Sequence, residues 1–77
     1  MDEVVSKLNF LFDSVKPSLP EQKARWIEES LEANERGLAL EYILEYKLEF
    51  NIPVDDDFRE AARYCGDQMR IDVERYL

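Results

Sequence analysis

The sequence contains no histidine and only one cysteine, and these two shortages exclude several classes of site. Without histidine, the Ser-His-Asp and Cys-His catalytic arrangements and the usual zinc and di-iron ligand sets cannot form. A single cysteine, Cys65, cannot close an internal disulfide, so nothing marks the chain as a disulfide-stabilised secreted scaffold. The two glycines are too few for a phosphate-binding glycine loop. We therefore expect no enzymatic activity, no cofactor and no metal site.

The sequence also lacks a long apolar run and a leader of charged and then apolar residues. A membrane-spanning helix needs about 20 apolar residues, so we expect neither a membrane span nor a signal peptide, and a cytoplasmic location. Acidic residues number 18 against 10 basic ones, which gives a net charge of −8. Like charge repels polyphosphate and anionic lipid, so direct binding to nucleic acid or membrane is not expected.

The few helix-breaking residues divide the chain into four segments. The breaks fall at residues 17–20, 34–37 and 51–54, and no segment alternates like a strand. We predict an all-α fold, a compact bundle of three to four helices that forms a single domain over residues 1–77. The third segment, residues 37–50, is apolar nearly all round, which is typical of a central helix. Cys65 lies on the apolar face of the fourth segment and is expected to be a buried structural thiol.

Local signals predict where the helices begin and end. Ser18 with Glu21, and Asp57 with Glu60, have the spacing of capping boxes for the second and fourth helices. Asn34 and Asn51 can adopt the left-handed conformation that ends a helix, and Ile52 is expected to fold back onto the last turn of the third helix. The apolar face of the fourth helix is expected to continue through Val73 and Tyr76.

The negative charge is concentrated in the middle of the chain. Residues 34–58 contain seven acidic and two basic residues, a net charge of −5. Glu41, Glu45 and Glu49 follow one another at intervals of four and form an acidic stripe on the third helix, although like charges at this spacing repel. The stripe is either a solvated edge or a docking surface for a basic partner. In the second case Asp55, Asp56 and Asp57 extend it, and one or two of them also cap the fourth helix.

Several large apolar side chains lie off the predicted core faces, with Phe10 and Trp26 the clearest cases. They either pack against a second neighbour within the bundle or form a protein-binding surface, which would also allow a homodimer. Tryptophan and tyrosine are over-represented among the residues that dominate binding energy. We therefore take Trp26, Tyr42 and Phe10 as candidate apolar anchors.

The size, acidity and helicity of the chain suggest an acyl carrier protein, and residues 48–56 resemble the end of that family's second helix and the acidic turn after it. Carriers attach phosphopantetheine to a serine at the start of that helix. Alignment on Glu49 and Phe50 places Arg36 at the serine position, so the carrier function fails. An adaptor module with a carrier-like fold and no prosthetic group remains as an alternative.

Residues 37–69 resemble a second group more closely. The shared positions are residues 37–41, Leu44, Leu48, Glu49, residues 52–54, Gly66 and Met69, within about half of the chain. On these residues the chain is similar to the Maf-type (MafI-like) immunity proteins of bacterial polymorphic toxin systems. The resemblance implies a protein that binds and neutralises the C-terminal domain of a cognate toxin, often a nuclease. A nuclease domain tends to be basic, so the acidic residues above would meet it with opposite charge.

Overall fold

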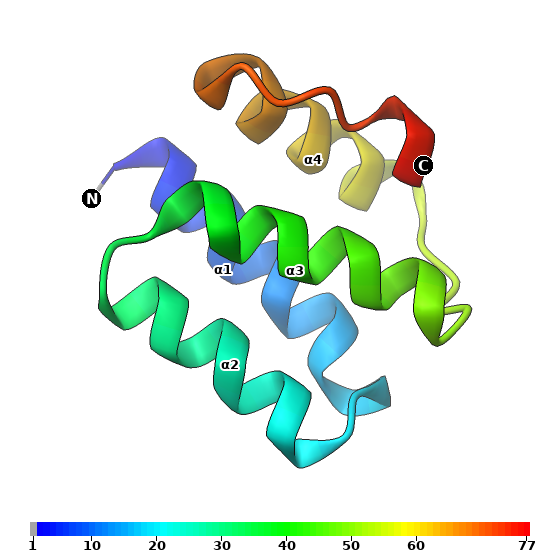
Figure 1. Cartoon of the computed structure of the whole chain (residues 1–77). Coiled ribbons are helices and arrows are strands. Elements are labelled where there is room, and N and C mark those ends of the chain that lie inside the picture. Colours follow the sequence, from blue (N-terminus) through cyan, green and yellow to red (C-terminus); the bar gives the residue numbers. More distant parts are fainter. Residues whose placement is uncertain (1) are drawn as a thin grey trace.

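The computed structural model describes residues 2–77 and contains four α-helices and two short 3-10 helices in that range. The α-helices are α1 (Glu3–Val15), α2 (Glu21–Glu32), α3 (Arg36–Glu49) and α4 (Asp56–Met69), and the 3-10 helices are η1 (Lys16–Ser18) and η2 (Glu74–Tyr76). No strand occurs within residues 2–77, and the Cα radius of gyration is 11.1 Å. The predicted all-α bundle is confirmed (Figure 1).

Helix α3 lies at the centre of the bundle, as its apolar sequence predicts. It packs against α1, α2, α4 and η2, whereas α2 packs mainly on α3, and α1 packs mainly on α4. Figure 1 shows α3 crossing in front of α1, with α2 and α4 on either side. The fully buried core includes side chains from all four helices: Leu8, Leu11, Val15, Ile27, Leu40, Ile43, Leu44, Phe58 and Cys65.

The first turns of α1 and α4 are capped by aspartate. The Asp2 carboxylate accepts a hydrogen bond of 2.8 Å from the backbone N–H of Val4. Asp55 does the same for the N–H of Phe58 at 2.9 Å, so the predicted capping box at Asp57 is wrong by two residues. A carboxylate at this position satisfies a free N–H and favours the helix dipole. The expectation that one of the three aspartates caps the fourth helix is confirmed.

Helix α2 begins without a side-chain cap, and the predicted capping box of Ser18 and Glu21 is wrong. Ser18 ends η1, Leu19 is extended at φ −100° and ψ 144°, and Pro20 occupies the N-cap position. The residue before a proline avoids the helical region, so Leu19 cannot belong to the helix that a cap at Ser18 would start. Proline at residue 20 therefore delays α2 until Glu21.

Three helices end at residues in the left-handed region, and none of these residues is glycine. The φ angles are 59° at Asn34, 50° at Asn51 and 57° at Arg70. The two asparagines end α2 and α3 as predicted, and the N–H of Ile52 donates to the carbonyl of Lys47 at 3.0 Å. Arg70 ends α4, which corrects the expected continuation of that helix through Val73 and Tyr76.

Residues 70–77, the C-terminal segment, reverse direction and pack back onto the bundle. Val73 and Tyr76 are buried, and the Arg63 guanidinium holds Glu74 at 2.8 and 3.2 Å, which lowers the pKa of that carboxyl. A Cβ at Gly66 would lie 2.7 Å from the carbonyl oxygen of Ile71 and 2.8 Å from Cγ1 of Val73. Glycine is therefore required for the segment to lie this close to α4.

Candidate protein-binding surface

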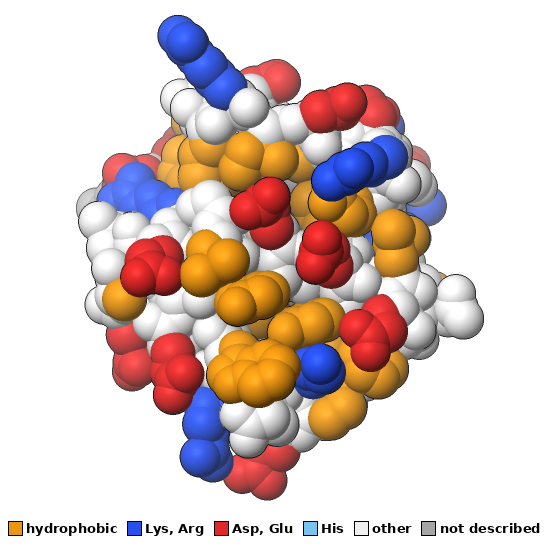
Figure 2. Space-filling view, viewed as in Figure 1, with side chains coloured by type: hydrophobic (Ala, Val, Ile, Leu, Met, Phe, Trp, Pro, Cys, Tyr) orange, Lys and Arg blue, Asp and Glu red, His pale blue; other side chains and the backbone are white. Residues whose placement is uncertain are grey.

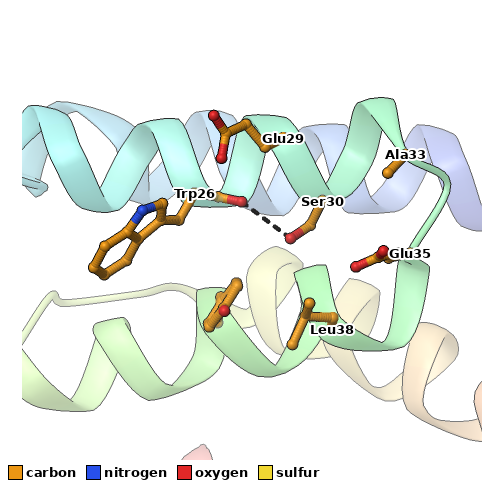
Figure 3. Close-up of a pocket in the computed structure, with 7 residues that line it drawn as sticks. Trp26, Glu29, Ser30, Ala33, Glu35 and Leu38 are labelled. Carbon is orange, nitrogen blue, oxygen red and sulfur yellow. Dashed lines mark hydrogen bonds between the residues drawn. The ribbon is translucent and has the colours of Figure 1, made fainter.

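An open groove of about 410 Å³ lies between α2 and α3. Figure 3 shows α2 on one side, α3 on the other, and the turn that joins them closing one end, where Glu35 lies. Trp26 stands toward the opposite end. The lining consists of large apolar or aromatic, small and acidic side chains: Trp26, Tyr42, Leu38, Ser30, Ala33, Glu29 and Glu35.

The groove exposes two large apolar side chains. Trp26 keeps 39 % of its surface accessible and Leu38 keeps 38 %. Ser30, 6 % exposed, forms part of the floor, and its hydroxyl donates to the carbonyl of Trp26 at 3.0 Å (Figure 3). Because this hydroxyl already has a partner, an apolar group can cover the floor without leaving a polar atom unsatisfied.

A row of aromatic rings continues from the groove along α3. Tyr42 and Tyr46 stack with ring centroids 5.6 Å apart, and Phe50 meets Tyr46 edge-on at 6.4 Å. The Lys23 ammonium lies between two rings, 4.9 Å from the centroid of Trp26 and 5.1 Å from that of Tyr46. Burial, and then the negative charge of neighbouring groups, raises the pKa of Tyr46. These contacts hold Trp26 in place before any partner arrives.

Two acidic residues of α2 pair with cations, Glu21 with Arg25 and Glu28 with Lys16, but in the part of the chain that the structure describes those farther along, from the end of α2 through α3, do not. Within residues 2–77, no ion pair involves the six consecutive acidic residues of the sequence from 29 to 49: Glu29, Glu32, Glu35, Glu41, Glu45 and Glu49. The basic residues in this stretch are engaged elsewhere, Arg36 with Asp2 at 2.8 Å and Lys47 with the carbonyl of Tyr76 at 2.8 Å. The predicted acidic stripe is exposed on α3, and Figure 2 shows acidic side chains on either side of an apolar band.

The structure does not gather all the predicted partner-binding residues on one surface. Trp26, Tyr42 and the α3 glutamates share the α2–α3 face, whereas Phe10 and Asp57 line a second open groove between α1 and α4. Asp55 caps α4, and Asp56 pairs with Arg59 at 3.2 Å. Asp55 and Asp56 therefore serve the start of α4, which follows the end of α3 through a short connection (Figure 1).

Sequence reasoning did not single out Leu38 among the many apolar residues of the third segment. A signal was present, since Leu38 precedes Glu41 and Glu45 by three and seven residues and so shares their helical face. It also missed Glu29 and Glu35, which reach the groove only because α2 turns back onto α3 at Asn34.

Other kinds of chemistry find little support in the residues that the structure describes. Within residues 2–77, no three His, Cys, Asp or Glu side chains are grouped closely enough to hold a metal ion, and none of the helices has the length and apolar character needed to cross a membrane. Cys65 is fully buried beside the carbonyl of Val4, as predicted, and burial raises the pKa of its thiol to about 11. No family model, no curated protein and no solved structure matches the chain.

Proposed function

We propose that this chain is an immunity protein that binds and neutralises the C-terminal domain of a cognate bacterial toxin, a basic nuclease, in the cytoplasm. The observation that carries the proposal is the α2–α3 face, on which unpaired carboxylates surround an exposed apolar groove. Such a surface has the anatomy of a protein-binding site, an apolar centre with a charged rim. The resemblance of residues 37–69 to Maf-type immunity proteins supplies the class of partner.

The net charge of −8 suits this task. An acidic protein attracts a basic domain over several ångströms, which speeds encounter and orients the two surfaces before contact. Apolar anchors at the centre then supply most of the affinity, with Trp26 and Tyr42 as the candidates. Inhibition follows from occupancy, because a nuclease whose basic surface is covered cannot bind polyphosphate.

The direct test begins with the genes beside the one that encodes this chain, where the proposal expects a large secreted protein with a toxic C-terminal domain; that domain is then co-expressed with the chain. We expect the chain to restore growth and to form a one-to-one complex, measured by size-exclusion chromatography with light scattering. A toxin domain that kills equally well with and without the chain, and that elutes separately from it, would contradict the proposal.

The role of the acidic stripe is tested with two charge-matched variants. Glu41→Lys with Glu45→Lys alters the α3 stripe, and Asp13→Lys with Asp67→Lys alters exposed, unpaired acids on α1 and α4 by the same total charge. We expect the first to slow association by about tenfold or more at low salt and the second to slow it less. The difference should shrink as salt screens the charges. Equal effects would mean that net charge alone matters.

The second candidate function is an adaptor with a carrier-like fold. Arg36, at the position of a carrier's serine, is bound to Asp2 and Asn34 at the start of α3 and offers no hydroxyl for a prosthetic group. Intact mass after incubation with a phosphopantetheinyl transferase should therefore be unchanged. An adaptor would also use the α2–α3 groove, but its partner would not be toxic.

A further inference from the structure

We propose that the α2–α3 groove is the docking site for a basic amphipathic helix, one of whose apolar side chains is seated between Trp26 and Leu38. The inference deepens the proposed function by naming the part of the toxin domain that the groove would hold, and to that extent it rests on that function. The shape, polarity and charge of the groove carry it.

The shape of the groove favours a helix. Its walls are two helices joined by a tight turn, and an amphipathic helix is the usual occupant of such a groove. A peptide that binds as an added β-strand would need a sheet edge, and residues 2–77 contain no strand to provide one. Ser30, whose side chain is small, lies across the groove from Leu38, and Ala33 lies nearer the turn (Figure 3). A side chain projecting from the occupant would enter beside Ser30, between Trp26 and Leu38.

The polarity of the groove favours an apolar side chain at its centre. Trp26 and Leu38 are more than a third exposed, and the hydroxyl of the buried Ser30 already donates to the Trp26 carbonyl. Covering these side chains removes apolar surface from water without leaving the Ser30 hydroxyl unpaired. Trp26 is already held by Lys23, so little side-chain freedom is lost on binding.

The charge around the groove favours a basic occupant. Glu29 on α2 and Glu35 in the turn lie among the lining residues, and Glu45 and Glu49 continue along α3, all without a cationic partner in residues 2–77. Lys or Arg side chains on either side of the apolar anchor would neutralise them. A second copy of this chain would instead bring a further net charge of −8, so charge complementarity argues against self-association through the groove.

The groove between α1 and α4 is a weaker candidate because a cation is one of its lining residues, whereas Lys23 lies over the Trp26 ring and does not line the α2–α3 groove. Lys7 lines the α1–α4 groove, 4.0 Å from the Glu3 carboxylate and 5.1 Å from the centroid of Tyr64. A basic occupant would meet this ammonium. Phe10 in this groove is as exposed as Trp26, which makes it a useful control rather than a second site.

The experiment uses the fluorescence of Trp26, which is the only tryptophan in the chain and lies in the groove. The probe is a synthetic amidated peptide of about 18 residues, long enough to form a helix, with leucine on one face and lysine elsewhere. Its control has the same leucines and glutamate in place of lysine. We expect a saturable, one-to-one blue shift of Trp26 with the lysine peptide, weakened by salt, and none with the glutamate peptide.

Matched variants locate the binding site. Leu38→Ser removes an exposed groove residue, and Ala33→Arg places a cation in the groove. Leu48→Ser is the matched control, since Leu48 lies on the same helix, is 47 % exposed and does not line the groove. We expect the first two variants to weaken peptide binding by at least about tenfold, and Leu48→Ser and Phe10→Ser to bind like the wild type. Far-ultraviolet circular dichroism checks that each variant remains folded.

Several outcomes would overturn the inference. These are no binding of the lysine peptide, equal binding of the glutamate peptide, and equal losses in Leu38→Ser and Leu48→Ser. A Trp26 shift that grows with protein concentration alone would assign the groove to a second copy. The peptide needs no toxin, so the two proposals fail separately: growth rescue without peptide binding removes only this inference, and peptide binding without growth rescue removes only the immunity function.

Discussion

The α1–α4 half of the bundle, with the C-terminal segment, and the α2–α3 half use their charged residues differently. In the first half, Arg63 holds Glu74, Lys7 pairs with Glu3 and Arg59 pairs with Asp56. In the second half, Glu21 and Glu28 of α2 are paired, but all six acidic residues from 29 to 49 lack an ion pair within residues 2–77. Unpaired acids such as Asp13 and Asp67 also occur in the first half, so the difference is that the second half has a longer unbroken run of them. Exposed ion pairs contribute little to stability, so the difference concerns what each half presents to solvent more than how firmly it folds.

Exposed apolar surface follows the same division. Of the four large apolar residues exposed in residues 2–77, Trp26, Leu38 and Leu48 belong to the α2–α3 half, and Phe10 belongs to the other. Exposed apolar side chains that add nothing to the core indicate a binding surface when they lie beside unpaired charged groups. Both halves supply side chains to the core, and the α2–α3 half exposes most of the large apolar side chains that a partner could cover.

The largest expected effect is a difference in chemical accessibility between the single cysteine and the single tryptophan. Cys65 lies in the α1–α4 half and Trp26 in the α2–α3 half. The pKa of the Cys65 thiol is raised from 9.0 to about 11, which lowers the thiolate fraction about 100-fold near neutral pH, and burial blocks access further. Native protein should therefore resist thiol alkylation, whereas acrylamide should quench Trp26 at once. Alkylation as fast as in denaturant would show that the α1–α4 half opens readily.

The next effect tests whether the C-terminal segment restrains the first half. Gly66→Ala should lower the free energy of unfolding by about 1–3 kcal/mol, because the added methyl group overlaps Ile71 and Val73. Gly37→Ala is the matched control, since its Cβ would lie an ordinary 3.6 Å from Cδ1 of Ile71. That change should be neutral or stabilising by up to about 1 kcal/mol. Urea unfolding measures both, and equal values would contradict the packing argument.

The smallest effect tests the uncompensated charge of the second half. Glu45→Gln removes repulsion with both Glu41 and Glu49, and should raise stability by about 0.2–0.5 kcal/mol for each pair at low salt. Glu21→Gln removes the contact with Arg25 at 3.2 Å and should change stability slightly in the opposite direction. Thermal unfolding at two ionic strengths compares them. A loss of stability in Glu45→Gln would mean that the stripe serves the fold.

The sequence predicts the fold class from helical periodicity and the central position of α3 from apolar residues on nearly every side of that helix, although two of its leucines are exposed. It predicts the left-handed ends at Asn34 and Asn51 because asparagine tolerates that conformation. It misplaces the start of α2, where Pro20 extends Leu19, and the end of α4, where Arg70 takes a conformation that arginine rarely adopts. At the start of α2 the neighbouring proline overrides the capping pattern, and at the end of α4 the packing of the C-terminal segment overrides the helical pattern.

The candidate surface was only partly predictable. The acidic stripe and Trp26 could be found from helical spacing, because each lies off an apolar face. The groove could not, since Glu29 and Leu38 become neighbours only when α2 folds back onto α3. Nor could the sequence show that Phe10 and Trp26 lie in different grooves, because which helices pack together depends on the whole bundle.

The left-handed helix ends carry a consequence for engineering. Asn34, Asn51 and Arg70 occupy left-handed positions where glycine would be free of strain, whereas glycine at residue 66 permits close packing. A non-glycine side chain in this region costs about 1–2 kcal/mol, least for asparagine. The chain therefore holds an unused margin of thermostability, reachable at Arg70 without touching the groove. That margin would let a designer rebuild the α2–α3 face for a new partner.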